Sequence, residues 1–475
     1  MQLSALILIL ILLAGLTQVI SWALRRLFAR SLIMAVFLVC YPADLLAVAI
    51  SDEVYLTPTI YWSARTSETD FVNATLTILL AWVTATCVLA LFPPPLRPGN
   101  SLLALRSGRT IVIVGLAAVL GGLVLSRVLA VGIDAALASR QAVFGDDALT
   151  LIAYFALPVL VPFAVASFPA ASLVSRVMLS FAITAALLAT FLTGSRSGLF
   201  LSALLPAGIV LWRLVGRRAS AVGRDILRLA LIVTTGTLVV FGGAWYLSEF
   251  RGVSASEGFF RSTDISQADV LIALIAEGEA PAMGSTYLAG ITTLIPRSLW
   301  PEKPLPGNVV SSVILTPDRY QLTGAETTAG LLGEAFINFG FTGGIIGGLI
   351  LATLLIILER LLASEDLAVW ALGVLLTLRF VNVVRGDLAN IAAPSLIAVA
   401  VWLLVYGGRK AAGFRSRVER QSSPRSPVQA DRHTTEVGSA AHADGRSSSQ
   451  RGESRFKMPD VSVVRRPPDA ERTSL

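Results

Sequence analysis

The sequence predicts an all-α, polytopic integral membrane protein, and three features of its composition support this fold class. Hydrophobic residues make up 55% of the 475 residues, whereas charged residues make up 15%. Apolar runs of at least ~18 residues recur as far as residue 407, and each is long enough to cross a hydrocarbon core of about 30 Å. Segments of about ten residues with alternating polarity, which mark a membrane barrel, do not occur. Since backbone groups in lipid must be paired within their own element, we expect the runs to be helices.

About 11 apolar runs account for residues 1–407, which we take as one transmembrane domain. The first run follows Met1 without a preceding positive charge or a clear cleavage site, so we interpret it as a retained span. The expected spans are residues 3–21, 31–50, 71–92, 111–131, 149–168, 174–192, 197–215, 227–248, 330–357, 367–385 and 390–407.

Charges in the connections predict how these spans are oriented. Basic residues gather in every second connection and after the last span, at Arg25, Arg26, Arg30, Arg97, Arg106, Arg109, Arg176, Arg213, Arg217, Arg218, Arg224, Arg409, Lys410, Arg415 and Arg417. The connections on the other side are mixed or acidic, as in 52–70 and 134–147. Because basic connections tend to remain in the cytoplasm, we expect the N-terminus outside and the C-terminus in the cytoplasm.

Two segments are not expected to cross the membrane. Residues 408–475 are rich in Ser, Arg, Pro and Asp and hold 14 basic and 8 acidic residues, so we predict a disordered cytoplasmic tail with some affinity for anionic lipid. Six of the seven net positive charges belong to this tail, which argues against nucleic acid as a partner. Residues 249–328 form one large outer loop, whose length is typical of a functional segment. Within it, residues 269–277 are expected to form a short helix on the membrane surface.

Histidine and cysteine are too scarce in the membrane domain to suggest a metal site. Both histidines, His433 and His442, lie in the tail, and Cys40 and Cys87 lie inside apolar runs. The usual general base and the commonest metal ligand are therefore missing from the membrane domain. We expect no cofactor, no metal and no disulfide framework.

Two arginine motifs are expected at the outer face. The first carries Arg196 between two glycines that allow a tight turn, where N–H groups of the next helix can face an anion. Its alternative is an arginine that snorkels to the headgroups. The second, residues 295–304, has three prolines that hold Arg297 and Lys303 in a rigid segment. Its alternative is a surface loop anchored at the interface by Trp300.

A third motif lies where the tenth expected span reaches the outer face. Arg379, Asn382 and Arg385 are spaced by three residues and cluster on one side of a helix. At 1.5 Å per residue Arg379 lies about 9 Å deeper than Arg385. A buried arginine is costly unless it faces a polar cavity or a partner, and a structural ion pair with Asp387 or Glu334 is the alternative.

A fourth motif opens the ninth expected span. Glu334 and Asn338 are four residues apart and share a helix face. A carboxylate inside an apolar span is a functional candidate. Gly340, Gly344 and Gly348 are instead expected to let neighbouring helices approach closely.

Together the motifs predict an outward-facing cavity for a polyanionic ligand. Its expected lining is Arg196, Arg297, Arg379 and Arg385, with Glu334 and Asp387 nearby. Guanidinium groups remain charged and bind phosphate oxygens in a bidentate manner. A lipid-linked diphosphate reached at the bilayer surface fits this description.

The motif set resembles the O-antigen polymerase (oligosaccharide repeat-unit polymerase) family of bacterial envelopes. Gly-Ser-Arg, Pro-Arg-x-x-Trp-Pro-x-Lys-Pro, Leu-Gly-Glu…Asn-Phe-Gly and Arg-Gly-Asp occur in this order over about residues 194–387. The resemblance implies a multi-span glycosyltransferase of the bacterial inner membrane, with a periplasmic N-terminus. It also implies an undecaprenyl-diphosphate-linked oligosaccharide as substrate, with membrane lipid and a polysaccharide chain-length regulator as further partners.

The resemblance implies roles for individual residues of this sequence. Arg196, Arg297 and Arg385 match the family's outer-face arginines, and Lys303 and Glu334 are supporting positions. We predict substrate binding by Arg196, Arg297, Lys303, Asn338, Arg379 and Arg385. The arginines would stabilise the diphosphate as the glycosidic bond breaks. A carboxylate would activate the acceptor hydroxyl, and the candidates are Glu334 and Asp387, with Asp44 behind them.

Three other functions are compatible with many spans. The related O-antigen ligases are expected to use an outer-face histidine, and this chain has none outside its tail. Transporters or flippases of lipid-linked oligosaccharides often show internal repeats and helices broken at the midplane, neither of which is evident here. A structural or length-regulating protein usually has fewer spans and a larger outer domain.

Overall fold

The chain is an all-α polytopic membrane protein. The computed structural model describes residues 2–51, 55–57, 60–61, 67–95, 109–138, 143, 147–193, 198–215, 266–278, 281–295, 297, 299–324 and 326–407. Within them, nine helices are long and apolar enough to cross a membrane. The described residues also include one short antiparallel strand pair, β1 (Tyr55–Thr57) and β2 (Ile60–Tyr61). The predicted tail, residues 408–475, lies outside the described residues.

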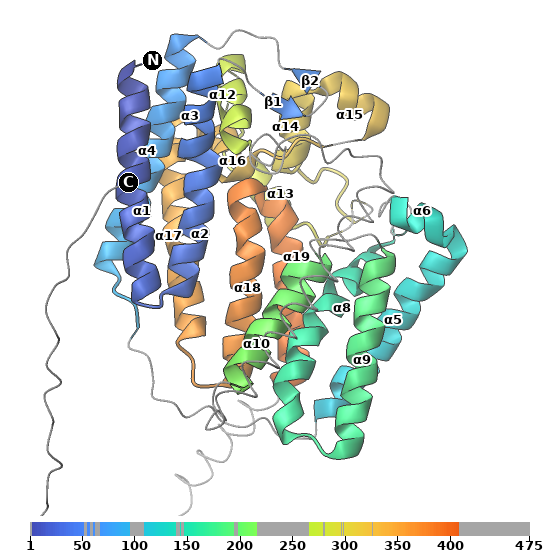
Figure 1. The fold of residues 1–475 in the computed structure, drawn as a ribbon. Helices are drawn as coiled ribbons and strands as arrows, with labels where there is room; N and C mark the ends of the chain where they lie inside the picture. Colours follow the sequence, from blue (N-terminus) through green and yellow to red (C-terminus); the bar gives the residue numbers. More distant parts are fainter. Residues whose placement is uncertain are drawn as a thin grey trace, which may run out of the picture. The chain divides into compact units, whose positions relative to one another are not determined.

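Nine of the expected spans coincide with long helices. They are α1 (Gln2–Leu24); α2 (Phe28–Leu38) with η1 (Val39–Ala43) and α3 (Asp44–Ser51); α4 (Glu68–Leu91); α5 (Thr110–Val131); α8 (Ala148–Ser167); α9 (Leu173–Leu192); α16 (Gly330–Phe339) with η6 (Gly340–Thr342) and α17 (Gly343–Leu362); α18 (Leu367–Arg385); and α19 (Leu388–Tyr406) (Figure 1). The expected span 197–215 forms a shorter pair, η4 (Gly198–Leu204) and α10 (Leu205–Val215). The expected span 227–248 lies outside the described residues.

Two of the spans are interrupted, and each interruption has a local cause. Pro42 has no N–H to donate and lies in the π-helical turn η1 between α2 and α3. Gly340 has a φ of 58°, which ends α16 before η6 and α17 begin. The N–H of Met283 donates to the carbonyl of Asn338 at 3.0 Å, so the end of α16 is satisfied by a segment from elsewhere in the chain.

Gly344 and Gly348 of α17 allow it to pack closely against α4, as the sequence predicted, whereas the prediction is wrong for Gly340, where a Cβ would meet nothing within 4 Å. A Cβ at Gly344 would lie 2.8 Å from the carbonyl oxygen of Thr77, and one at Gly348 would lie 2.5 Å from that of Ala81. Real Cβ atoms do not approach backbone oxygens so closely. Glycine is therefore required for this helix pair to form at its present separation.

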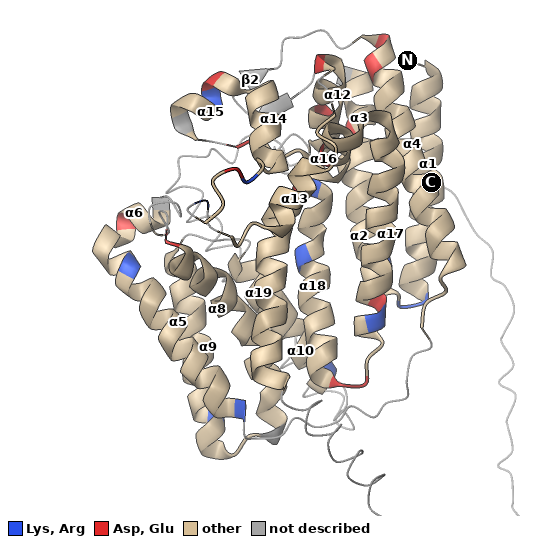
Figure 2. Ribbon diagram, turned by 180° about the vertical axis from the view of Figure 1, so that it is seen from behind, with Lys and Arg blue, Asp and Glu red and all other residues tan. Residues whose placement is uncertain are grey.

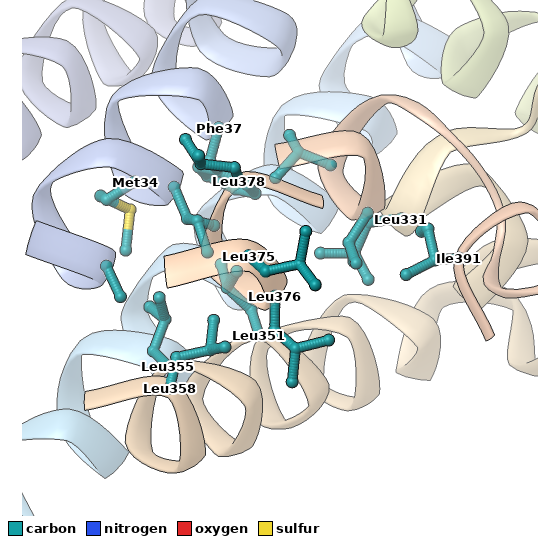
Figure 3. Close-up of a cluster of buried hydrophobic side chains, with 14 of the residues drawn as sticks. Met34, Phe37, Leu331, Leu351, Leu355, Leu358, Leu375, Leu376, Leu378 and Ile391 are labelled. Carbon is teal, nitrogen blue, oxygen red and sulfur yellow. The ribbon is translucent and has the colours of Figure 1, made fainter. Parts of the chain in front are cut away.

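Two clusters of buried hydrophobic side chains hold the helices together. In the larger one, Met34 and Phe37 of α2 meet Leu355 of α17 and Leu375 of α18 (Figure 3). The smaller one joins α5, α8, α9 and η4. Helix α8 contributes to both clusters. The most apolar window of α18 is 78% buried, compared with 22% for α1 and 28% for α5 and α9, so α18 is central and the other three face lipid.

The large predicted loop contains four short helices among the described residues: α12 (Gln267–Glu277), α13 (Ser285–Ile291), α14 (Gly307–Leu315) and α15 (Pro317–Thr323). The predicted helix at 269–277 is present, but its placement on the membrane surface is wrong. Leu271, Ile272 and Leu274 are at most 2% exposed, because α12 packs between α3, α4, α14 and α16. A helix that is apolar on all sides is buried in this way.

Charged residues are sparse along the spans and gather near helix ends and connections (Figure 2). The basic residues of α18 are different, because they lie along the half of that helix nearer to α13. We call this the Arg385 end of the bundle, where α18 ends and α16 and α19 begin. A short helix, α6 (Ile133–Ala138), follows α5, and a 3₁₀ turn, η3 (Phe168–Ala170), follows α8.

Candidate functional site

A cavity of about 230 Å³ lies at the Arg385 end, between α8, η4, α18 and α19. It is lined by Tyr154, Phe155 and Pro158 of α8; Gly198 and Ser202 of η4; Arg379, Asn382 and Arg385 of α18; Asn390, Ile391 and Pro394 of α19; and Thr328 and Gly386. Both of the buried hydrophobic clusters therefore contribute walls to it. The lining among the described residues contains two guanidinium groups and no carboxylate.

The spacing of α18 places its three polar side chains on the cavity. Arg379, Asn382 and Arg385 follow one another at intervals of three residues, so they share one side of the helix. Because α18 is central in the bundle, that side faces other helices and not lipid. Exposure increases along this row and onto α19: Arg379 is 6% exposed, Arg385 is intermediate and Asn390 is exposed. The exposure of these lining residues therefore decreases from Asn390 to the buried Arg379.

Arg379 is buried, and the described residues offer its guanidinium no hydrogen-bond acceptor. Among the described residues it forms no hydrogen bond and no ion pair, and its Nε has no partner. The structural ion pair with Asp387 or Glu334, which the sequence left open, is not formed, because both carboxylates bind other groups. A buried charge without a partner is costly, so the cavity favours an anionic ligand that would supply the missing acceptors.

Glu334 and Asp387 lie beside the Arg385 end but do not line the cavity. Glu334 accepts a hydrogen bond from the Thr286 hydroxyl at 3.0 Å and from the N–H of Leu388 at 2.6 Å. Asp387 accepts from the N–H of Asn308 at 2.7 Å and caps α19 through the N–H of Asn390 at 3.1 Å. Glu334 is 2% exposed and Asp387 is 0% exposed. Burial raises the pKa of Asp387 above its ordinary value, against the opposing effect of the two N–H donors.

Asn338 joins α16 to α13 and does not line the cavity. Its Nδ2 donates to the Thr286 hydroxyl at 2.6 Å and to the carbonyl of Glu334 at 2.8 Å. Its Oδ1 accepts from the N–H of Thr286 at 3.3 Å. The amide is therefore fully engaged within the protein, and its predicted contact with substrate remains a prediction.

Arg297 and Lys303 close the proline-rich segment on itself. The Arg297 guanidinium donates to the carbonyl of Lys303 at 3.0 Å and to that of Pro304 at 3.3 Å. Lys303 Nζ donates to the carbonyl of Ile295 at 3.1 Å, and burial, together with the positive charge of Arg297, lowers the pKa of Lys303. These three bonds join the two ends of the described part of the segment, while the rigidity expected from its prolines remains a prediction. Neither side chain lines the cavity.

The remaining predicted residues are Arg196 and Asp44. Arg196 lies outside the described residues, although Gly198 and Ser202 of the element that follows it do line the cavity. Asp44 is 7% exposed and accepts from the N–H of Ala268 at 2.9 Å. It therefore binds α12 to the second span.

The sequence motifs missed several residues at this end. Tyr154, Ser202 and Asn390 line the cavity, and their signal was a polar group within an apolar run. Tyr41, which is 0% exposed, donates to the carbonyl of Val384 at 2.9 Å and accepts from the N–H of Leu332 at 3.0 Å. Tyr41 thus connects the second span to the residue that precedes Arg385.

Comparison with models of known families, with curated proteins and with solved structures finds no significant match for this chain. We therefore infer a function from the cavity itself. Its decisive features are two arginines on one helix side, a buried guanidinium without an acceptor among the described residues, and the position of the cavity at the end of membrane-spanning helices.

Proposed function

We propose that the chain is a membrane glycosyltransferase that polymerises polyprenyl-diphosphate-linked oligosaccharide repeat units into surface polysaccharide. The observation that carries this proposal is the buried guanidinium of Arg379, which shares with Arg385 a cavity whose described lining residues include no carboxylate. Two guanidinium groups in one cavity favour a ligand with at least two negative oxygens. A lipid diphosphate has these oxygens and is delivered along the membrane, which the surrounding helices cross.

The cavity lining also suits a sugar attached to the diphosphate. Asn382 and Asn390 offer amide donors and acceptors, and Tyr154 and Ser202 offer hydroxyl groups. An apolar ligand would offer no acceptor to the Arg379 guanidinium and no hydrogen-bonding partner to the polar lining. A glycan joined to a phosphate can satisfy both kinds of group, since it carries hydroxyls as well as negative charge.

The proposed reaction is a transfer from one lipid carrier to the next repeat unit. The bond between the anomeric carbon of the growing chain and its diphosphate oxygen breaks, and the polyprenyl diphosphate leaves with the electron pair. The anomeric carbon forms a new bond to a hydroxyl oxygen of the incoming lipid-linked unit, and the hydroxyl proton passes to the diphosphate or to water. Arg379 and Arg385 would stabilise the charge that develops on the departing diphosphate.

The sidedness of the reaction follows from the orientation that loop charges predict. If basic connections lie in the cytoplasm, the Arg385 end faces the periplasm of a bacterial inner membrane, with the N-terminus on the same side. The cavity would then meet its lipid-linked substrates after they have been translocated. Positive charge for the diphosphate comes from the arginines, so the proposal includes no metal.

The test is complementation of a strain from which the gene has been deleted. We expect the deletion strain to accumulate single lipid-linked repeat units in the periplasm, and the wild-type chain to restore polymer. Arg379→Ala and Arg385→Ala should each lower polymer formation about 100-fold or more. Arg176→Ala, which removes an exposed arginine of α9 outside the cavity, is the matched control and should restore polymer fully.

Other outcomes of the same experiment would identify other functions. Long polymer that is not attached to its acceptor would indicate a ligase. Lipid-linked units that remain on the cytoplasmic side would indicate a flippase. Full polymer formation with both Arg379→Ala and Arg385→Ala would show that the cavity is not the site of transfer.

A further inference from the structure

The two buried carboxylates at the Arg385 end are saturated by the protein itself. Each oxygen of Glu334 and Asp387 accepts a hydrogen bond, from Thr286, Leu388, Asn308 and Asn390 respectively, over 2.6–3.1 Å. A carboxylate oxygen has further lone pairs, but exposed fractions of 2% and 0% leave them facing protein atoms. No acceptor hydroxyl can therefore reach either group in this arrangement.

The packing around Glu334 leaves no room for a substrate hydroxyl. A Cβ at Gly307 would lie 3.0 Å from the carboxylate carbon of Glu334, so the first residue of α14 is already in contact with this group. A general base must come within about 2.6–3.2 Å of the proton that it removes, directly or through one water. Neither carboxylate lines the cavity that holds the arginines.

The same hydrogen bonds fix the chain on both sides of Arg385. Before it, the carbonyl of Val384 accepts a hydrogen bond from Tyr41. After it, Asp387 caps α19 and binds the start of α14, while Glu334 binds the N–H of Leu388. Helix N-termini carry partial positive charge, so the starts of α14 and α19 offset part of the cost of burying these carboxylates.

We infer that Glu334 and Asp387 are positioning residues, which hold the turn of Arg385 at the cavity, and that neither is the general base of the transfer. The inference rests on the proposed function for its catalytic part. Its structural part, the fixing of residues 386–391, does not depend on the reaction. An experiment can therefore contradict the catalytic part without contradicting the structural part, and the reverse.

Substitution of Glu334 by Gln and by Ala distinguishes positioning from base catalysis. A Gln side chain can accept from Leu388 and donate to the second lone pair of the Thr286 hydroxyl, so Glu334→Gln can keep both contacts, with the Thr286 bond reversed, while it loses the charge. A positioning role predicts that Glu334→Gln retains transfer within about 10-fold, while Glu334→Ala loses about 10- to 100-fold. A general base predicts that both variants lose about 100-fold or more.

Two readouts on the full-length protein in nanodiscs accompany the transfer assay. Hydrogen exchange of residues 386–391 should become faster in Glu334→Ala and remain unchanged in Glu334→Gln. Binding of undecaprenyl diphosphate should weaken in Glu334→Ala, because the turn of Arg385 is no longer held. Loss of transfer in Glu334→Gln with normal exchange and normal binding would overturn the inference.

A matched control comes from the opposite end of α17. Glu359 is also a buried carboxylate, 4% exposed, and accepts a hydrogen bond from the N–H of Arg30 at 3.2 Å. Glu359→Ala should alter exchange near residues 28–31 and leave residues 386–391 unchanged. If it altered residues 386–391 as Glu334→Ala does, the effect would be general loosening and the inference would fail.

Asp387→Asn decides the question if the Glu334→Ala protein does not fold. Asn is a good N-cap residue, so the bond from Asn390 is kept while the one from Asn308 is weakened. We expect transfer within about 10-fold of wild type. Complete loss of transfer with unchanged exchange would make Asp387 the base. If instead Arg379→Ala and Arg385→Ala leave transfer intact, the proposed function fails, and the exchange data still test the positioning role.

Discussion

Two arginines buried within the bundle have opposite surroundings. Arg30 is 3% exposed, and its guanidinium donates to the carbonyls of Leu89 at 3.4 Å and Phe92 at 2.9 Å. Arg379 is 6% exposed and has no such acceptors among the described residues. Arg30 therefore joins helices together, whereas Arg379 has no such bond among the described residues and is the group that the proposed ligand would engage.

Replacing each of these arginines should separate stability from binding. Arg30→Ala leaves two carbonyls without a donor and should lower the thermal unfolding temperature in detergent. Arg379→Ala removes a costly buried charge and loses no hydrogen bond to a described residue, so it should not lower the unfolding temperature. It should weaken binding of undecaprenyl diphosphate about 100-fold. Unfolding at equally low temperature in both variants would contradict the distinction.

Asp147 provides a pH dependence that can be measured at a single residue. The Thr150 hydroxyl, at 2.6 Å, and Arg127, at 3.0 Å, lower the pKa of Asp147 from 3.8 to about 2. A folded-state pKa below the unfolded value stabilises the protein above about pH 4, and this contribution is lost as the pH falls toward 2. We expect Asp147→Asn to flatten the pH dependence of unfolding between pH 4 and 2. An unchanged slope would show that Asp147 does not contribute.

The pair of α4 and α17 shows how a helix face determines packing. Gly348→Ala would place a Cβ 2.5 Å from the carbonyl of Ala81, which should force the helices apart at a cost of about 1–3 kcal/mol. Gly122→Ala in α5 meets nothing within 4 Å and serves as the control; alanine favours helix there. Equal stability of the two variants in chemical unfolding would contradict the packing account.

Helices were predictable where local sequence properties, such as run length and residue spacing, determine them. Of the eleven spans that apolar run length predicted, nine coincide with long helices among the described residues. The spacing of α18 predicted that its arginines share a side. The roles of Glu334 and Asp387 were not readable, because their partners, such as Thr286 and Asn308, come from segments 48 and 79 residues away. The Arg297 side chain donates to the carbonyl of Lys303 in its own segment. The prolines of that segment did not predict this contact.

The helix α12 and the cavity illustrate the same limit for whole elements. The apolar residues of α12 predicted a helix but could not specify whether lipid or other helices would cover it. The cavity needs α8 and η4 on one side and α18 and α19 on the other. No local pattern joins helices so distant in sequence, and only their packing does.

The orientation of the whole molecule can be tested by cysteine labelling in intact cells. In a chain with Cys40 and Cys87 replaced by Ala, Asp318→Cys lies on α15 of the predicted outer loop, and Glu365→Cys lies on the predicted cytoplasmic side. We expect a membrane-impermeant maleimide to label Asp318→Cys directly and Glu365→Cys only after permeabilisation. The reverse pattern would place the cavity on the cytoplasmic side and exclude periplasmic polymerisation.

The small size of the cavity has a consequence for the product. About 230 Å³ between four helices accommodates only the joining ends of two substrates, so the rest of a long glycan must extend into the surrounding water. A polymer of five units and one of fifty would then make the same contacts with the protein during transfer. Under the proposed function, the protein joins units but does not measure the length of the polymer. The length distribution of the polysaccharide must then be set by how long the diphosphate stays bound or by a second protein.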